Sequence, residues 1–79
     1  LNSVEAYVVG VANDRPFSPS DNDMLQHLNV KRARLSQISN RLLKHGILQV
    51  RQSGRRRNYS LTQTARAQLI AWGIVGGDE

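Results

Sequence analysis

The chain has 79 residues, a formal net charge of +5 and 39% apolar residues, enough for one thin core in a single domain and too few for a deep substrate cavity. It has no cysteine, which excludes disulfides, thiolate chemistry and the common zinc-finger sites. No apolar run approaches the ~20 residues that span a bilayer, and the first residues show no signal-peptide pattern. We therefore expect a cytoplasmic, nucleoid-associated protein with no membrane partner.

The basic residues are concentrated in one segment. Between positions 31 and 66 the chain has ten basic residues and no acid, and all six acids lie outside this segment. Because like charges without opposite neighbours repel one another, such a segment predicts a polyanionic partner. Leucine and isoleucine recur through it at helical spacing, which favours a folded nucleic-acid-binding surface over disorder.

Two helices are expected in the first third of the chain. Asn2 can cap a helix over residues 2–13, with Glu5 at the capping-box position, and the turn sequence at 13–16 ends it. A second helix of about ten residues is predicted from Ser18, with Pro19 at its first helical position and Asp21 in its first turn.

A third helix is predicted from about Arg32 to His45. Leu35, Ile38 and Leu42 fall on one apolar face of it, and Gly46 is suited to the left-handed position that ends a helix. Only four positions separate the last apolar residue of the second helix, at 28, from residue 33. The two helices must therefore meet at a sharp angle, which predicts a helix-turn-helix.

A hairpin and a last helix follow. Residues 47–52 and 55–61 alternate in polarity on both sides of Ser53 and Gly54, which predicts a β-hairpin with a cationic tip. Thr62 can cap a helix that ends near Gly73, and residues 76–79 read as a flexible tail. The predicted fold is mainly α with a small β-hairpin, in one domain over residues 1–75.

This order of elements resembles the winged helix-turn-helix transcription regulators of the ArsR and MarR kinds. Residues 35–48 look like the recognition helix and the glycine after it, and residues 54–62 are similar to the return strand of the wing and the threonine opening the next helix. The resemblance implies a transcription regulator that binds double-stranded DNA sequence-specifically and acts as a dimeric repressor. Lys31 departs from the Ser or Thr that often caps this helix, and the family's metal-binding cysteines are absent. We therefore expect no cofactor and no small-molecule effector.

The DNA-binding residues are predicted from the third helix and the hairpin tip. Gln37 and Asn40 can each offer a donor and an acceptor to adenine, and Arg41 can bind guanine with two hydrogen bonds. The start of the helix is placed for phosphate contact, and one or two wing arginines for the backbone or the minor groove. A merely solvated helix face is the alternative, but such faces usually contain Glu and this one has none. The predicted DNA-binding residues are Lys31, Arg32, Arg34, Ser36, Gln37, Asn40, Arg41, Lys44, Arg55, Arg56 and Arg57.

The terminal helices are apolar on more than one side, which predicts a homodimer interface, unless the small core needs every apolar residue. The predicted interface residues are Tyr7, Val8, Val11, Leu69, Ile70 and Trp72.

Other functions have weaker support in the sequence. His27 and His45 have no Cys or carboxylate partner, so no metal site is expected. The sequence has no recognisable set of catalytic residues, so we expect no enzyme. Because the chain begins with Leu1 and not Met, a nucleic-acid-docking module of a larger replication, recombination or modification protein is the alternative function. A protein-interaction domain is a third, disfavoured by the acid-free basic segment.

Overall fold

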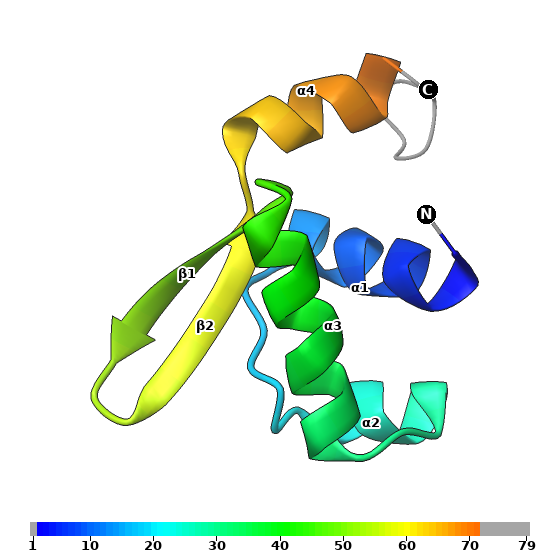
Figure 1. Ribbon diagram of the computed structural model, residues 1–79, viewed down its shortest axis with the longest axis vertical. Helices are drawn as coiled ribbons and strands as arrows, with labels where there is room; N and C mark the ends of the chain where they lie inside the picture. Colours follow the sequence, from blue (N-terminus) through cyan, green and yellow to red (C-terminus); the bar gives the residue numbers. More distant parts are fainter. Residues whose placement is uncertain (1, 72–79) are drawn as a thin grey trace.

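The computed structural model describes residues 2–71 and has four helices and one hairpin (Figure 1). In chain order the elements are α1 (Ser3–Asp14), α2 (Asn22–Leu28), α3 (Arg32–Lys44), β1 (Leu48–Ser53), β2 (Arg56–Leu61) and α4 (Gln63–Ala71). The mainly helical architecture with one β-hairpin is confirmed. The predicted end of the last helix near residue 73 and the predicted tail at 76–79 lie outside the described residues.

The predicted capping box starts α1. The Asn2 side chain accepts a hydrogen bond from the Glu5 amide at 2.8 Å, and the Glu5 carboxylate accepts one from the Asn2 amide at 3.3 Å. Two otherwise unpaired backbone donors are thereby satisfied. The helix buries Val8, Val9 and Ala12 in the core.

The second helix begins later than predicted, at Asn22 instead of Ser18, and has seven residues. Ser18 starts a turn instead, because its carbonyl accepts from the Asp21 amide at 2.9 Å and its hydroxyl from the Ser20 amide at 3.3 Å. The Asp21 carboxylate then caps the helix by accepting from the Met24 amide at 3.2 Å. Ser and Asp are N-cap residues of similar strength, and the hydroxyl of Ser18 is engaged in the turn, so the helix begins after Asp21.

Asp21 has a shifted pKa. Burial raises the pKa of its carboxyl group, but hydrogen bonds from the Met24 amide and from the Arg15 guanidinium, 3.0 Å away, outweigh burial and leave the pKa below its ordinary value of 3.8. A carboxyl with a lowered pKa stabilises the fold above the unfolded-state pKa, and this stabilisation is lost as pH falls through the folded-state pKa.

We expect Asp21→Ala to lower the free energy of unfolding by about 1 kcal/mol at pH 7, the value of a lost helix cap. The difference from the parent chain should shrink as pH falls below 3.8 and on through the lower pKa of the folded state, because the parent carboxylate becomes protonated over that range and its stabilisation is lost. Thermal unfolding at pH 7 and at acid pH measures both effects. Asn22→Ala, at the exposed neighbouring position, is the control; equal losses in the two variants would contradict the assignment of the cap.

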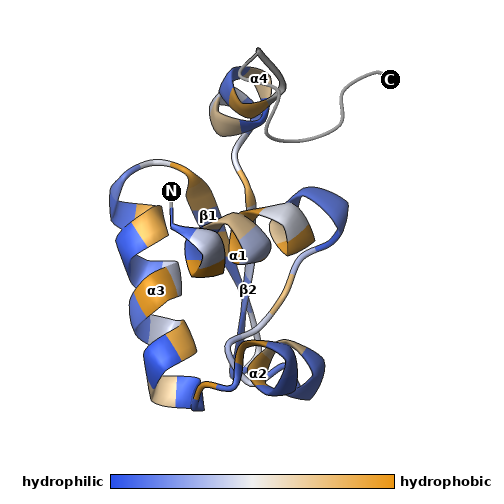
Figure 2. Ribbon diagram, turned by 90° about the vertical axis from the view of Figure 1, so that its right-hand side faces the viewer, coloured by the Kyte–Doolittle hydropathy of each residue, from blue (hydrophilic) through white to orange (hydrophobic). Residues whose placement is uncertain are grey.

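The third helix matches its prediction closely. It begins at Arg32 with Lys31 at the N-cap, and no side-chain hydrogen bond caps it. Leu35, Ile38 and Leu42 are buried, and Gly46 has a φ of +76° just after the helix, in the left-handed region that favours glycine. Figure 2 shows the hydrophobic residues of α3 turned toward α1 and its hydrophilic residues turned outward.

The hairpin is antiparallel, with Leu48 opposite Leu61 at its base and Ser53 opposite Arg56 at its tip. The two-residue turn is therefore 54–55, one position later than predicted. Gly54, with a φ of +62°, is the first central residue of this turn, where the primed hairpin turns require a left-handed φ.

The base of the hairpin is held by the rest of the fold. Tyr59 of β2 and Phe17 exchange two backbone hydrogen bonds of 2.7 and 2.9 Å, and their rings stack with centroids 5.6 Å apart. Thr62 caps α4 as predicted, because its hydroxyl oxygen accepts from the Ala65 amide at 3.1 Å, and it also donates to the Gly46 carbonyl at 2.8 Å. The hairpin is thus fixed beside α3.

Candidate nucleic-acid interface

Two sides of α3 border hollows in the surface. Its first turn faces the hairpin and the loop before α2 across an open groove of about 660 Å³. Its other side faces the start of α1 across a smaller depression of about 130 Å³. Residues 32, 33 and 36 lie on the first side, and residues 34, 37, 38 and 41 on the second.

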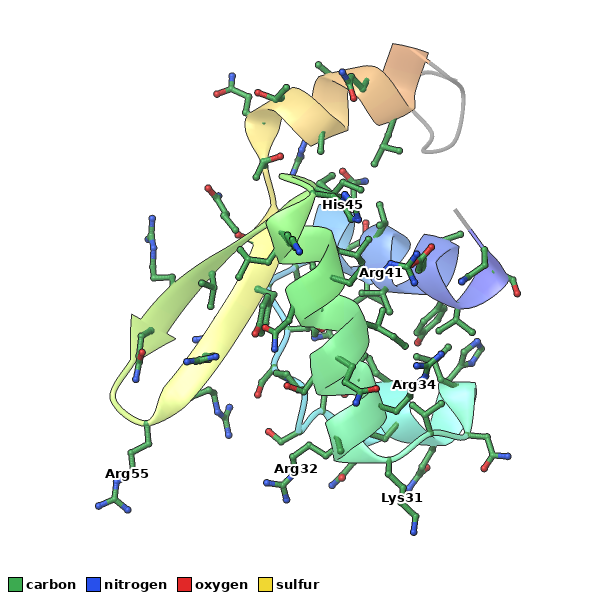
Figure 3. The ribbon with its side chains drawn as sticks, viewed as in Figure 1. Lys31, Arg32, Arg34, Arg41, His45 and Arg55 are labelled. Carbon is green, nitrogen blue, oxygen red and sulfur yellow. The ribbon has the colours of Figure 1, made fainter. Side chains whose placement is uncertain are left out.

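The larger hollow, which we call the arginine groove, is cationic. Four arginines line it and no acidic residue does. Its lining residues are Ser18, Pro19, Ser20, Arg32, Ala33, Ser36, Ser53, Arg55, Arg56, Arg57 and Tyr59. Figure 3 shows Lys31 and Arg32 at the start of α3 and Arg55 at the hairpin tip, all extending toward the same side of the molecule. Five of the predicted DNA-binding residues therefore line one surface, and Lys31 extends toward the same side of the molecule.

All three wing arginines line this groove, one from the turn and two from β2. Arg51, on β1, borders a separate hollow with Pro16, Asn58 and Ser60 instead. The hairpin therefore has four exposed arginines, of which Arg51 alone does not line the groove, and Arg51 and Arg56 lie on opposite strands. This pair allows a matched comparison.

Arg41 has a neighbour that the sequence did not predict. Its Nε lies 3.8 Å from Oε2 of Glu5, and 69% of its side chain is exposed. Within residues 2–71, no other cation of the basic segment lies within 4.0 Å of a carboxylate. No sequence signal could have found this contact, because it depends on how α1 packs across α3.

Asn40 is also engaged. Its Oδ1 accepts a hydrogen bond of 2.7 Å from the Tyr59 hydroxyl. The predicted adenine contact uses both ends of the amide, and one end already has a partner inside the chain. Gln37, by contrast, is exposed, and its side chain makes no hydrogen bond to another described residue. Lys44 is exposed on the last turn of the helix.

Two of the predicted dimer residues lie in the core of the chain and not on its surface. Val8 and Leu69 are 0% and 3% exposed within the chain's own core, so they have almost no surface to bury against a second copy. Tyr7 and Val11 are half-buried on α1. The side chain of Ile70, and Trp72 as a whole, lie outside the described part of the chain.

The two histidines also lie apart from any cluster of ligands. His27 stacks on Tyr7, with ring centroids 4.2 Å apart, and His45 follows α3. Across residues 2–71 no three His, Asp or Glu side chains gather as a metal site would require. None of the described helices is long and apolar enough to cross a membrane.

The chain matches no protein-family model and no curated protein sequence, but it is similar to several solved structures. The adhesin competence repressor AdcR of Streptococcus pyogenes superposes with a TM-score of 0.75 at 16% identity, over 92% of this chain and 54% of AdcR. FabT of Streptococcus pneumoniae, solved in complex with DNA, has a TM-score of 0.75 at 19% identity, over 92% of this chain and 52% of FabT.

A third similar structure is a homodimeric winged helix-turn-helix DNA-binding domain, Mb0332 of Mycobacterium bovis, a possible ArsR-family regulator. It has a TM-score of 0.73 at 15% identity, over 91% of this chain and 65% of that domain. These likenesses show that the fold is a winged helix-turn-helix, as predicted. This chain spans about half the length of AdcR and FabT.

Proposed function

We propose that the chain binds double-stranded DNA sequence-specifically, as the DNA-binding domain of a transcription regulator. The observation that carries the proposal is the arginine groove, which has four arginines and no acid and lies directly beside the exposed polar side of α3. Cations of this density supply phosphate affinity, and exposed amide side chains on a helix supply base recognition. The two requirements of sequence-specific binding thus lie on neighbouring sides of α3.

In this proposal α3 enters the major groove, which is wide enough to admit a helix. Gln37 then faces base edges. The wing arginines contact the backbone or the adjacent minor groove, where guanidinium groups favour a narrow, negative geometry. The fold shared with FabT, solved in complex with DNA, supports this docking.

Enrichment of genomic fragments by the purified chain tests the proposal. We expect one recurring motif, and tighter binding to a duplex carrying it than to a scrambled duplex of equal length. A variant with both Arg32→Ala and Arg56→Ala, which removes two groove cations, should lose most of the enrichment. Equal recovery of all fragments by the parent chain would contradict sequence specificity.

We further propose that the regulator is a homodimer and acts as a repressor. Support comes from the homodimeric state of Mb0332 and from AdcR, which is named as a repressor. Two copies joined by their terminal helices would place their recognition helices about 34 Å apart, one turn of DNA. Tyr7 and Val11 are the described interface candidates with surface to contribute.

Sedimentation velocity at micromolar concentration tests the assembly. We expect a dimer, and a melting temperature that rises with protein concentration, because association stabilises the folded state by mass action. The enriched motif should then have two-fold symmetry. A monomer that binds the full motif with undiminished affinity would overturn the dimer and leave DNA binding intact.

Under this proposal the Glu5 carboxylate competes with DNA for Arg41. We expect Glu5→Gln to bind duplex DNA about twofold to fivefold more tightly, because it removes one negative charge 3.8 Å from a cation at the interface. Glutamine still supports the capping box, so the melting temperature should change little. Fluorescence anisotropy on the enriched duplex measures the affinity. Unchanged or weaker binding by folded Glu5→Gln would contradict the competition.

A further inference from the structure

The hydrogen bond between Tyr59 and Asn40 joins the wing to α3. The Tyr59 hydroxyl donates to Asn40 Oδ1 at 2.7 Å. Tyr59 is 1% exposed, whereas Asn40 lies on the solvent side of the helix. Its two residues are 19 positions apart in the chain. The contact therefore comes from the tertiary fold.

Tyr59 is the fixed partner in this pair. Its backbone pairs with Phe17 in both directions, its ring stacks on the Phe17 ring, and Val50 is its cross-strand partner in the hairpin. A side chain held in this way has little freedom to follow another group. Asn40 has an exposed side chain with no other hydrogen-bond partner in the described residues, so the tyrosine sets the orientation of the amide.

This orientation determines which end of the amide is available. A primary amide has an oxygen with two acceptor lone pairs and a nitrogen with two donor hydrogens. The Tyr59 hydroxyl occupies one lone pair of the oxygen and restrains the amide, whereas no described residue accepts a hydrogen bond from the nitrogen. A bidentate contact with adenine needs the oxygen to accept from N6 while the nitrogen donates to N7, so the restrained oxygen would have to accept a second hydrogen bond.

We infer that Asn40 recognises a hydrogen-bond acceptor on the major-groove edge, and that Tyr59 is the positioning residue that sets this preference. Guanine presents two acceptors, N7 and O6, and thymine presents O4, whereas cytosine presents a donor and adenine a donor beside its N7. Asn40 therefore favours guanine or thymine, in place of the adenine predicted from its residue type alone. The inference rests on the proposed DNA binding and adds the base class to it.

Selection of binding sites from a random duplex library tests the inference in two steps. The motif position at which base preference disappears in Asn40→Ala is the position that Asn40 contacts. We expect the motif of the parent chain to have guanine or thymine at that position. Tyr59→Phe keeps the buried ring and frees the amide oxygen. It should shift the preference at that position toward adenine by about twofold to tenfold, the range that one hydrogen bond supports.

Asn40→Asp provides a second variant at an exposed position, in case Tyr59→Phe destabilises the fold. Aspartate can still accept from Tyr59 but has no donor, so the guanine or thymine preference should be lost while the tyrosine is untouched. Adenine or cytosine at the Asn40-dependent position in the parent chain would overturn the inference. So would a folded Tyr59→Phe with an unchanged motif, an unchanged preference in Asn40→Asp, or an Asn40→Ala variant that alters no position. A parent chain that selects no motif at all would instead refute the proposed function.

Discussion

The affinity of this chain for duplex DNA is expected to fall several hundredfold between 50 and 200 mM salt. Each phosphate neutralised by Lys or Arg contributes roughly −0.9 to the slope of log K against log salt, because it releases condensed counterions. Arg32, Arg55, Arg56 and Arg57 line the arginine groove, and Lys31 extends toward the same side of the molecule, which gives five cations. About five phosphate contacts per chain would therefore give a slope near −4.5.

Anisotropy titrations of a labelled duplex across this salt range measure the slope. Arg56→Ala should make it less steep by about 0.9, because one groove cation is removed. Arg51→Ala removes the same charge from the other hollow of the hairpin, so its slope should stay close to that of the parent chain. A parent slope near zero would refute binding to the DNA backbone, and equal changes in the two variants would refute the assignment of the groove.

The elements that sequence reasoning placed correctly have strong local signals. The capping box of Asn2 and Glu5 places the start of α1, and Gly46 marks the end of α3. Both signals involve backbone groups within a few residues, so they act in the same way whatever packs around them. The predicted start of α2 was wrong because Ser18 and Asp21 are both good N-cap residues, and the hydroxyl of Ser18 is engaged in a turn while Asp21 caps the helix.

The parts that sequence reasoning missed depend on tertiary placement. The contact of Glu5 with Arg41 and that of Tyr59 with Asn40 each join distant parts of the chain, and no periodicity encodes them. The same holds for Val8 and Leu69, which are buried in the core. Where a helix is broadly apolar, its pattern does not distinguish the residues that the core uses from those left outside.

Gln37→Ala should separate base recognition from phosphate binding. Gln37 lies exposed on α3, and its side chain makes no hydrogen bond to another described residue. Its amide can therefore pair with a base edge. Losing such a contact should cost about 1–3 kcal/mol on the preferred site and almost nothing on random DNA. Arg56→Ala removes a cation of the groove and should weaken both duplexes by a similar factor, because a phosphate contact has no base information.

The comparison requires affinities of each variant for the enriched and the scrambled duplex at one salt concentration. The ratio of the two affinities should fall in Gln37→Ala and stay constant in Arg56→Ala. A constant ratio in both variants would place base recognition elsewhere than on Gln37. A ratio that falls in Arg56→Ala alone would move it from α3 to the wing. Since both residues are exposed, neither substitution leaves a cavity in the core, and any change in the ratio reflects the interface itself.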